Sequence, residues 1–313
     1  MTIQTIIGID VAKDELVSYR QDTDTEEVLE NNQASIKRWL RCLPAHCAIA
    51  IEATGTYHVL LIKLAYQYGH TVYVIDGYQL KHYRQGIGGR AKTDSSDARL
   101  LARYLSREQE ALRPWTPPPP AYRALQVLLR RRATLVRARV AIQQSCAELP
   151  ELKAPLKRLV AQLTRIDQVI QARLRAIVRE AGLSQHVARC QALEGVGSLT
   201  ATALVMAFLR GEFRHSDAFV AFLGLDVRVR DSGTQRGRRK LTKQGDPEVR
   251  RLLYNAAMSA SRQPAWQATY QGYLARGLKT TQALVIIARK LARIAFSLMK
   301  HEEEYRPPTT VAA

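Results

Sequence analysis

The sequence predicts an α/β domain followed by an all-α region, so we expect its 313 residues to form more than one domain. Short β-rich runs separated by a helix-length stretch occupy the N-terminal part. A proline-rich segment follows, and beyond it apolar residues recur every seven positions, a spacing typical of long packed helices. With 46% hydrophobic residues the chain can bury a substantial core. We expect domains at residues 1–112, 113–183 and 184–313.

The α/β domain is expected to open with a hairpin. The runs TIIGID (5–10) and ELVSY (15–19) are rich in β-forming residues and close enough along the chain to pair. Two more strands are predicted at AIAIEATG (48–55) and HTVYVIDG (70–77), with a helix-length stretch between them. A doubly wound nucleotide-binding fold would instead open with a strand, a glycine-rich turn and a helix, and the sequence has no G-x-G-x-x-G motif.

The segment RPWTPPPP (113–120) marks the clearest domain boundary. Successive prolines cannot join a helix interior or a central strand, so they predict a stiff extended linker. After it, apolar residues with a seven-residue period form two runs: Leu128, Leu135 and Ile142, then Leu156, Leu163, Ile170 and Ile177. Pro150 and Pro155 separate the runs, which predicts two long helices in an antiparallel hairpin or an intermolecular coiled coil. The same period favours a homodimer or a homotetramer.

A compact, mostly helical domain is predicted from Ser184 onwards. The stretch QALEGVGSLTATALVMAFL (191–209) has a G-V-G turn between two helical segments and resembles a helix-hairpin-helix element, whose free backbone amides can bind a phosphate. The stretch GDPEVRRLLYNAAMSA (245–260) starts another helix, with Asp246 as its N-cap and a proline at the first helical position. The last predicted helix, at 281–299, is apolar enough to be buried on most of its circumference.

Basic residues outnumber acidic ones by 47 to 28, and the formal net charge of +19 favours a polyanionic partner, nucleic acid first. The charge is clustered. Seven arginines and no acidic residue lie within 113–147, and seven basic residues lie within 227–243 beside a single aspartate. The candidate nucleic-acid contacts are Lys92, Arg130, Arg131, Arg132, Arg228, Arg230, Arg236, Arg238, Arg239, Lys240 and Lys243.

The sequence lacks the marks of membrane proteins and of disulfide-rich proteins. No apolar run reaches the roughly 18 residues that a membrane helix needs, and the first residues, MTIQTIIGIDVAKDE, lack the basic and apolar stretches of a signal peptide. We therefore expect a cytoplasmic protein. The cysteines, at positions 42, 47, 146 and 190, are too scattered for a disulfide framework or a zinc finger, and we expect reduced, mostly buried thiols.

Carboxylates fall at positions where ligands commonly bind. Asp10 ends the first predicted strand and Glu52 ends the run AIAIE, and strand ends of an α/β sheet form such an edge. Asp94 and Asp97 stand three apart at the start of a predicted helix. This pair has a structural alternative, because with Asp94 as N-cap Asp97 would stand at the third helical position and the two would mimic a capping box.

These carboxylates suit a metal ion. Converging carboxylates repel one another unless a hard cation is present, and their oxygens suit Mg²⁺, with Mn²⁺ as a second possibility. The candidate D-E-D-D metal site, of the RNase H-like and RuvC-like type, consists of Asp10, Glu52, Asp94 and Asp97. Asp76 also ends a predicted strand and is a possible substitute ligand.

Motifs around these acids resemble a known family. GIDVAK around Asp10, IEATGTY around Glu52 and KTDSSDA around the two later aspartates resemble the signature of DEDD insertion-sequence transposases of the insertion sequence one-ten type, relatives of the Piv-type DNA invertases. The motifs LEGVGSLTATAL, FVAFLGL and SGTQRGRRKLTKQGDPEVRRLL are similar to the C-terminal transposase domain of that family. The arginine-rich middle matches no motif. The resemblance implies a DNA transposase or site-specific recombinase with an RNase H-like domain, a helical linker and a helical serine domain.

The resemblance also implies how such an enzyme works. The metal-binding and serine domains, from different subunits, meet on DNA and cut and rejoin donor and target strands without a free double-strand break. A bridge RNA pairs with donor and target DNA, so base pairing determines the sequence while the protein binds backbone shape and charge.

Ser232, in VRVRDSGTQRGRR, falls where the resemblance places a catalytic serine. A Ser-Gly pair is most often a turn, which is the structural alternative. Its surroundings are densely cationic, and guanidinium groups would stabilise the extra charge on phosphorus during attack by a serine hydroxyl. Such an attack gives a covalent phosphoserine intermediate that conserves bond energy for rejoining. No histidine lies within ten residues on either side, so activation would come from metal or arginine.

Two other functions are compatible with the sequence. A RuvC-like Holliday-junction resolvase or endonuclease would use metal-activated water and form no covalent intermediate. A non-catalytic nucleic-acid-binding protein would bind with strong salt dependence and cleave nothing in Mg²⁺. The presence of every candidate acid and of the serine favours an enzyme over this last function.

Overall fold

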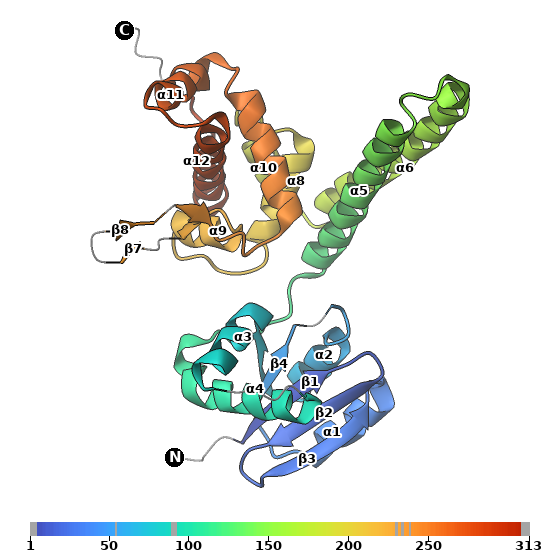
Figure 1. Ribbon diagram of the computed structural model, residues 1–313, viewed down its shortest axis with the longest axis vertical. Coiled ribbons are helices and arrows are strands. Elements are labelled where there is room, and N and C mark those ends of the chain that lie inside the picture. Colours follow the sequence, from blue (N-terminus) through green and yellow to red (C-terminus); the bar gives the residue numbers. More distant parts are fainter. Residues whose placement is uncertain are drawn as a thin grey trace. The chain divides into compact units, whose positions relative to one another are not determined.

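The protein is described here from a computed structural model, which describes residues 5–53, 55–88, 93–228, 231–232, 235–237 and 239–307. The chain divides into two compact units, Met1–Pro117 and Pro118–Ala313 (Figure 1). Each unit has a hydrophobic interior of its own. The first unit carries the predicted acids and the second carries Ser232.

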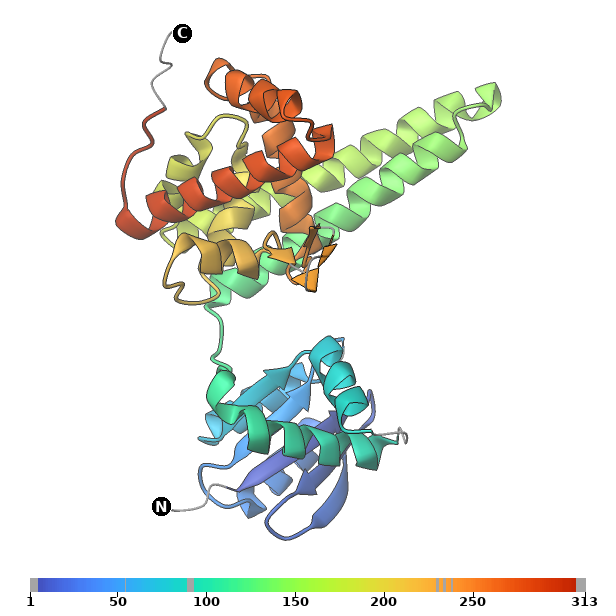
Figure 2. The ribbon, with the colours of Figure 1, turned by 60° about the vertical axis from the view of Figure 1, so that its left-hand side comes forward.

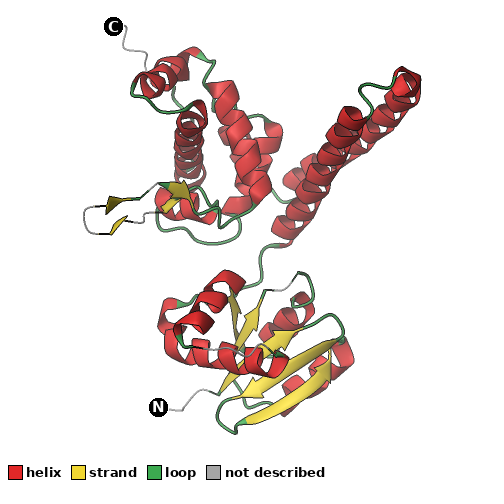
Figure 3. Cartoon of the chain, viewed as in Figure 1, coloured by secondary structure: helices red, strands yellow, loops and turns green. Residues whose placement is uncertain are grey.

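The first unit is built on a mixed five-stranded sheet of order β3-β2-β1-β4-β5 (Figure 3). Its strands are β1 Ile6–Val11, β2 Glu15–Arg20, β3 Thr25–Glu30, β4 Ala48–Glu52 and β5 Thr71–Ile75. The first three strands pair antiparallel in sequence order, whereas β4 and β5 run parallel to β1. These directions and this order are those of an RNase H-like sheet. They confirm the predicted fold class and the opening hairpin.

The edge strand β3 was not expected from the sequence. Its residues, TEEVLE, are mostly charged, and Val28 is 67% exposed. A strand that faces solvent in this way shows no apolar alternation, which is the pattern that predicts a strand. Its glutamates also protect the sheet edge against pairing with another chain.

One face of the sheet packs on α1 (Gln33–Cys42) and α2 (Val59–Gln67). The side chains of Ile49 and Ile51 join this core, together with those of Ile7 and the other odd-numbered apolar residues of β1. Alternate residues of a strand point to opposite faces, so the alanines of the run AIAIE face the other way.

The other face packs on α3 (Gly77–Gly86) and α4 (Asp94–Glu108). Ala48 and Ala50 of β4 contact this second core, and small side chains there let the helices approach the sheet. The short 3₁₀ helix Gln109–Ala111 lies between the end of α4 and the proline-rich linker.

In the proline-rich linker, residues 113–119 belong to no helix or strand. The backbone N–H of Trp115 donates to the carbonyl oxygen of Val72 in β5 at 2.6 Å, and the Trp115 ring packs edge-on against Tyr66 with 5.6 Å between centroids. The linker is therefore partly anchored on the first unit. Pro120 already occupies the first turn of α5 (Pro120–Ser145), where its missing N–H is tolerated.

In the second unit, α5 and α6 (Lys153–Glu180) lie side by side as an antiparallel hairpin (Figure 2). This is one of the two arrangements that the seven-residue repeat predicts. The deeply buried hairpin residues that join the helical core are Leu125, Leu129, Leu174, Ile177 and Val178. Farther along, Arg132 Nε and Asp167 Oδ1 form an ion pair at 2.7 Å between the two helices.

The remaining helices of the second unit surround one apolar core. They are α7 Ser184–Gln191, α8 Ser198–Phe208, α9 Ser216–Phe222, α10 Pro247–Ala260, α11 Pro264–Ala275 and α12 Thr280–His301. The helix α12 contributes buried residues from Ala283 to Met299, as its apolar sequence predicts.

Two local predictions for this unit are confirmed. Asp246 caps α10, because its Oδ1 accepts from the backbone N–H of Glu248 at 2.9 Å. The glycine turn joins α7 to α8, and Gly195 there has a φ of +79°. A Cβ on this glycine would collide with the backbone of Ala256 and Ala260 in α10, so the turn is packed against that helix.

Between α9 and α10 the chain forms short strands, which we call the serine hairpin (residues 227–241). Strand β6 (Val227–Arg228) pairs with β9 (Lys240–Leu241), and β7 (Asp231–Ser232) pairs with β8 (Gln235–Arg236). Both pairings are antiparallel. The sequence did not predict them, because a two-residue strand is too short to show alternation.

The four cysteines are free thiols. Cys47 and Cys190 are buried, Cys146 is half-buried and Cys42 is exposed, so the prediction of mostly buried thiols holds for two of the four. Burial raises the pKa of the Cys190 thiol to about 12, so this group stays protonated at neutral pH. Within the described parts of the chain, no helix combines the length and the apolar character that a membrane span requires.

Candidate metal centre and serine hairpin

Asp10 and Glu52 come together at one end of neighbouring strands. Strands β1 and β4 are parallel, with Ile9 opposite Ile51, so the next residue of each strand is a predicted carboxylate. Glu52 is in turn opposite Ile75 of β5. The register of the sheet thus brings together two acids that are far apart in the sequence.

Asp94 and Asp97 belong to the start of α4, but neither caps it. The N-cap is Thr93, whose Oγ1 accepts from the backbone N–H of Ser96 at 3.2 Å, while the N–H of Thr93 donates to Ser96 Oγ at 2.8 Å. The capping alternative for Asp94 is therefore wrong, because a neighbouring threonine and serine complete the capping box. The two carboxylates still interact favourably with the helix dipole.

The beginning of α4 lies directly on β1. A Cβ on Gly8 would collide with the carbonyl oxygen of Ala98 and the backbone nitrogen of Ala102. This close approach buries Asp97, whose residue surface is only 6% exposed. It also places the first turns of α4 beside the end of β1, where Asp10 lies.

The pKa of Asp10 shows that the acids share one neighbourhood. It is raised from 3.8 to about 6, first by burial and then by the negative charges of Asp97 and Asp94, with a smaller effect from Glu52. A backbone hydrogen bond at Val11 acts in the opposite direction. Each of the other predicted acids therefore lies near enough to repel an ionised Asp10.

The acids do not form a complete coordination shell. Among the residues that the structure describes, no three His, Cys, Asp or Glu side chains are arranged to hold a metal ion. Asp97 Oδ1 instead accepts from Arg84 Nη2 at 2.5 Å. The set nevertheless fits a hard cation in its chemistry, because its donors are oxygens and a positive ion would relieve the repulsion that raises the pKa of Asp10.

Glu52 lies against the start of α3. A Cβ on Gly77 would collide with Oε1 of Glu52, so the glycine leaves room for this carboxylate. Asp76, the possible substitute ligand, caps α3, and its Oδ1 accepts from the backbone N–H groups of Tyr78 at 2.9 Å and Gln79 at 3.2 Å. One carboxylate oxygen of Asp76 is thus occupied by hydrogen bonds to the start of α3.

Sequence reasoning missed Arg84 and Gly77, because it did not predict α3. An N-cap signal was present, since Asp76 follows an apolar strand and precedes a helix-length stretch. The ion pair between Arg84 and Asp97 had no sequence signal of its own, because it depends on how α3 packs against α4.

Ser232 lies in β7 opposite Gln235 of β8. The base of the serine hairpin is held by Thr242, whose Oγ1 donates to Asp226 Oδ1 and whose N–H donates to the carbonyl oxygen of Asp226 at 3.0 Å. Beside it, Arg250 Nη1 donates to the carbonyl oxygen of Leu223 at 3.3 Å, and burial lowers the pKa of this arginine. The backbone on either side of the hairpin is therefore anchored.

The predicted nucleic-acid contacts differ in their surroundings. The exposed ones are Arg130, Arg131, Arg228, Arg239, Lys240 and Lys243. Arg130 Nη2 pairs with Asp246 Oδ2 at 3.2 Å, whereas the side chain of Arg132 is only 16% exposed and is paired with Asp167 inside the helical hairpin. Arg236 lies in β8 opposite Asp231. Lys92, Arg230 and Arg238 lie outside the described residues.

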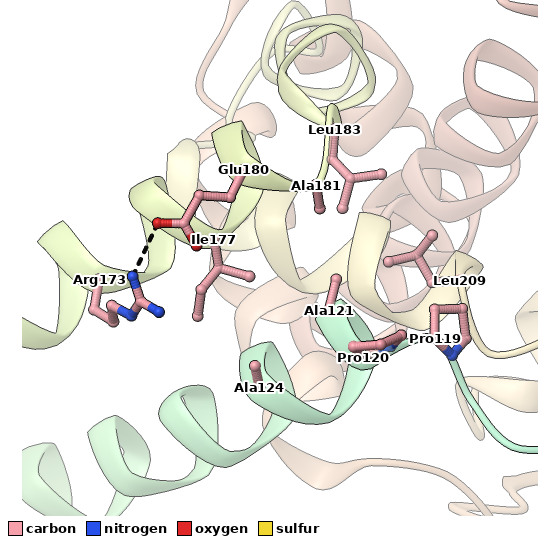
Figure 4. Close-up of a pocket in the computed structure, with 10 residues that line it drawn as sticks. All are labelled: Pro119, Pro120, Ala121, Ala124, Arg173, Ile177, Glu180, Ala181, Leu183 and Leu209. Carbon is pink, nitrogen blue, oxygen red and sulfur yellow. Dashed lines mark hydrogen bonds and ion pairs between the residues drawn. The ribbon is translucent and has the colours of Figure 1, made fainter.

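An open, mostly apolar pocket of about 470 Å³ lies between the start of α5, the end of α6 and Leu209 (Figure 4). Its charged lining residues are Arg173 and Glu180, whose Nη1 and Oε1 atoms form an ion pair at 3.0 Å, drawn as a dashed line in Figure 4. No candidate catalytic residue lines this pocket, so we assign it no part in the chemistry.

Two family models match the chain. A model of DEDD transposases of the IS110 type, described as transposase, matches residues 7–149. A model described as transposase of the IS116/IS110/IS902 family matches residues 187–271. The first match contains every predicted acid, and the second contains Ser232.

Known proteins resemble the chain over most of their length. A probable family 20 transposase of Pseudomonas aeruginosa is 29% identical, over 96% of this chain and 98% of its own. A pilin gene-inverting protein of Moraxella bovis is 25% identical over the same shares of the two chains. Among solved structures, Thermus thermophilus RuvC in complex with a Holliday junction substrate aligns with 36% of this chain and 100% of its own, at 15% identity and a TM-score of 0.26.

The two family matches follow one another in the order that the motifs predict, and relatives named as transposases align from one end of the chain to the other. The chain therefore belongs to the IS110 family of transposases.

Proposed function

We propose that this protein is a DNA recombinase that cuts and rejoins DNA strands with a D-E-D-D metal site and a serine nucleophile. The observation that carries the proposal is the register of β1 and β4, which sets Asp10 next to Glu52 at one end of the sheet. The raised pKa of Asp10, about 6, supports it, because the negative charges of Asp97 and Asp94 contribute to the shift. In a transposase, a cluster of mutually repelling carboxylates is best explained as a site for phosphodiester chemistry. The proposed domains are the metal-binding domain 1–112, the linker and long helices 113–183, and the serine domain 184–313.

The proposed metal ligands are Asp10, Glu52, Asp94 and Asp97. When bound, Mg²⁺, or Mn²⁺ in its place, would supply positive charge to the phosphate oxygens. The chain's own contribution is to position these ligands. The register of β1 and β4 sets Asp10 beside Glu52. The close contact of Gly8 with Ala98 and Ala102 lays α4, which carries both aspartates in its first turn, on β1.

Ser232 is the proposed nucleophile. Its hydroxyl oxygen forms a bond to phosphorus and gives up its proton while the bond from phosphorus to one strand oxygen breaks, and that departing oxygen gains a proton, so none is gained or lost overall. The resulting phosphoserine conserves the energy of the phosphodiester, so a hydroxyl from a second DNA end can attack it and release the serine. Basic residues of the serine hairpin, among them Arg228 and Lys240, would neutralise charge on the phosphate.

The proposed partners are donor DNA, target DNA and a structured bridge RNA. The net charge of +19 and the exposed arginines of α5 and of the serine hairpin support a polyanionic partner. In this proposal the chain acts as a homodimer or homotetramer, and the acids of one subunit combine with Ser232 of another. It would act on nucleoid DNA in the bacterial cytoplasm.

Covalent trapping tests the proposal. The full-length protein is incubated in Mg²⁺ with donor and target DNA and with the RNA that copurifies from its native host, and the reaction is stopped in detergent. We expect DNA attached to the peptide that contains Ser232, detected by mass spectrometry. The variant Ser232→Ala should form no adduct, whereas the control Ser259→Ala, at an exposed serine of α10, should behave as wild type.

The metal site is tested in the same assay. The variants Asp10→Ala, Glu52→Ala and Asp97→Ala, and wild type in EDTA, should lose recombination while most nucleic-acid binding remains. Cleavage without protein-linked DNA, retained in Ser232→Ala, would instead support a RuvC-like endonuclease that uses water. Salt-sensitive binding without any cleavage would support a non-catalytic nucleic-acid-binding protein.

A further inference from the structure

Arg84, in the last turn of α3, forms an ion pair with one of the candidate metal ligands. Its Nη2 lies 2.5 Å from Oδ1 of Asp97, and the two side chains are 18% and 9% exposed. Ser96 Oγ lies 3.3 Å from the same oxygen. Asp97 therefore already has a cationic partner within the chain.

This ion pair is better shielded from water than a comparable pair in the same unit. Arg20 Nε and Asp22 Oδ1 are 3.0 Å apart, with side chains 27% and 35% exposed. Exposed pairs contribute little to stability, whereas breaking a shielded pair leaves a charge that water solvates poorly. A metal ion that binds Asp97 must therefore compete with a strongly held guanidinium.

On the basis of the proposed metal site, we propose that Arg84 is the internal counter-ion of that site: it holds the Asp97 carboxylate and competes with the divalent cation for it. A guanidinium and a metal ion both bind a carboxylate through the lone pairs of its oxygens. Both also neutralise the same cluster of negative charge. Arg84 is thus a positioning residue, because it acts on the metal through Asp97.

The variant Arg84→Gln distinguishes competition between Arg84 and the metal ion from a purely structural role of this arginine. Glutamine keeps a polar side chain but removes the positive charge beside the ligands, so we expect Mn²⁺ to bind about tenfold more tightly. The Tm in EDTA should fall, because Asp97 loses its partner, and should recover when Mn²⁺ is added. Arg84→Lys keeps the charge without the planar guanidinium and should lie between wild type and Arg84→Gln.

The experiment uses the full-length protein without nucleic acid, so that activity is not the readout. Calorimetric titration with MnCl₂ gives the affinity, and thermal unfolding in EDTA and in Mn²⁺ gives the two Tm values. Arg20→Gln is the matched control, since it removes an arginine of an ion pair in the same unit away from the acids. It should leave the Mn²⁺ affinity unchanged.

Unchanged or weaker Mn²⁺ binding by Arg84→Gln overturns the inference, as does a Tm loss of equal size with and without Mn²⁺. A further variant, Asp10→Asn, separates this failure from failure of the metal site itself. If Asp10→Asn loses Mn²⁺ binding but Arg84→Gln does not bind Mn²⁺ more tightly than wild type, the metal site is supported and only the proposed competition by Arg84 is wrong. If wild type and Asp10→Asn both fail to bind Mn²⁺, the proposed metal site is wrong and the inference fails with it.

Discussion

Gly8 of β1 faces the carbonyl oxygen of Ala98 in α4 so closely that a Cβ on the glycine would overlap it. The glycine is required for this close approach and not for its backbone angles, because its φ is not positive. The contact lets α4 lie on the strand itself. It therefore determines how near Asp97 comes to Asp10.

Gly8→Ala should destabilise the protein by about 2 kcal/mol or more, because α4 must move away from β1 to admit the methyl group. Urea unfolding measures this loss. Gly86→Ala is the control, because no neighbouring atom lies within 4 Å of its added Cβ, so this substitution in α3 should be neutral or slightly stabilising. Wild-type stability in Gly8→Ala would show that α4 does not lie on β1 as described.

Gly77→Ala should affect the site without affecting the fold. Alanine favours the first turn of α3, but its Cβ would displace the end of the flexible Glu52 side chain. We expect unchanged or slightly higher Tm together with weaker Mn²⁺ binding and slower recombination. Calorimetric titration beside thermal unfolding checks this combination. Wild-type Mn²⁺ affinity in Gly77→Ala would indicate that Glu52 is not a ligand.

The raised pKa of Asp10 predicts a pH-dependent stability. The folded-state pKa is about 6 against an ordinary value of 3.8, so the folded protein favours the protonated form. The stability that this group contributes is fully present below pH 3.8 and is lost as the pH rises through about 6. Asp10→Asn, which cannot ionise, should therefore have a higher Tm than wild type in EDTA at about pH 7.5, and an equal Tm near about pH 4.

Divalent cations should remove the difference in Tm between Asp10→Asn and wild type at neutral pH. Bound Mg²⁺ stabilises the ionised carboxylate, so wild type should gain Tm at neutral pH while Asp10→Asn should gain little. Thermal scans across pH, with EDTA and with Mg²⁺, measure both effects. A difference between the proteins that does not depend on pH would contradict repulsion among the acids as its cause.

Asp246 has two contacts that substitution can separate. It caps α10 through the N–H of Glu248 and pairs with the exposed Arg130 at 3.2 Å. Asp246→Ala should cost about 1 kcal/mol, mostly through loss of the cap. Asp246→Asn keeps the cap and loses only the ion pair, so it should cost less than about 0.5 kcal/mol. Denaturant unfolding compares them, and equal losses would mean that the ion pair matters more than the cap.

The sequence alone predicted the elements whose apolar residues follow a regular pattern along the chain. The strand of Asp10 and the strand of Glu52 are buried apolar runs, and the long helices α5 and α6 repeat apolar residues every seven positions. Asp246 was predicted as a cap because a cap acts on amides of its own helix. Such features depend on residues that are neighbours along the chain, so local physics is sufficient to predict them.

The candidate site was predictable only in part. The sequence indicated that Asp10, Glu52 and Asp97 stand at strand ends and a helix start, and the family resemblance indicated their chemistry. It gave Asp94 a possible capping role that Thr93 and Ser96 in fact perform. The choice between these caps depends on where the helix begins, and a boundary can shift by a residue without changing the pattern.

Only the tertiary structure decided which distant groups meet. The exposed strand β3, the short strands around Ser232 and the pairing of Arg84 with Asp97 have no periodic signal in the sequence. Each depends on which surface packs against which, because an ion pair or a two-residue strand is stable only where neighbouring elements shield and align it. The sequence by itself determined the strands, the long helices and the acidic residues of this protein, and packing determined how near the acids lie and which cation they meet.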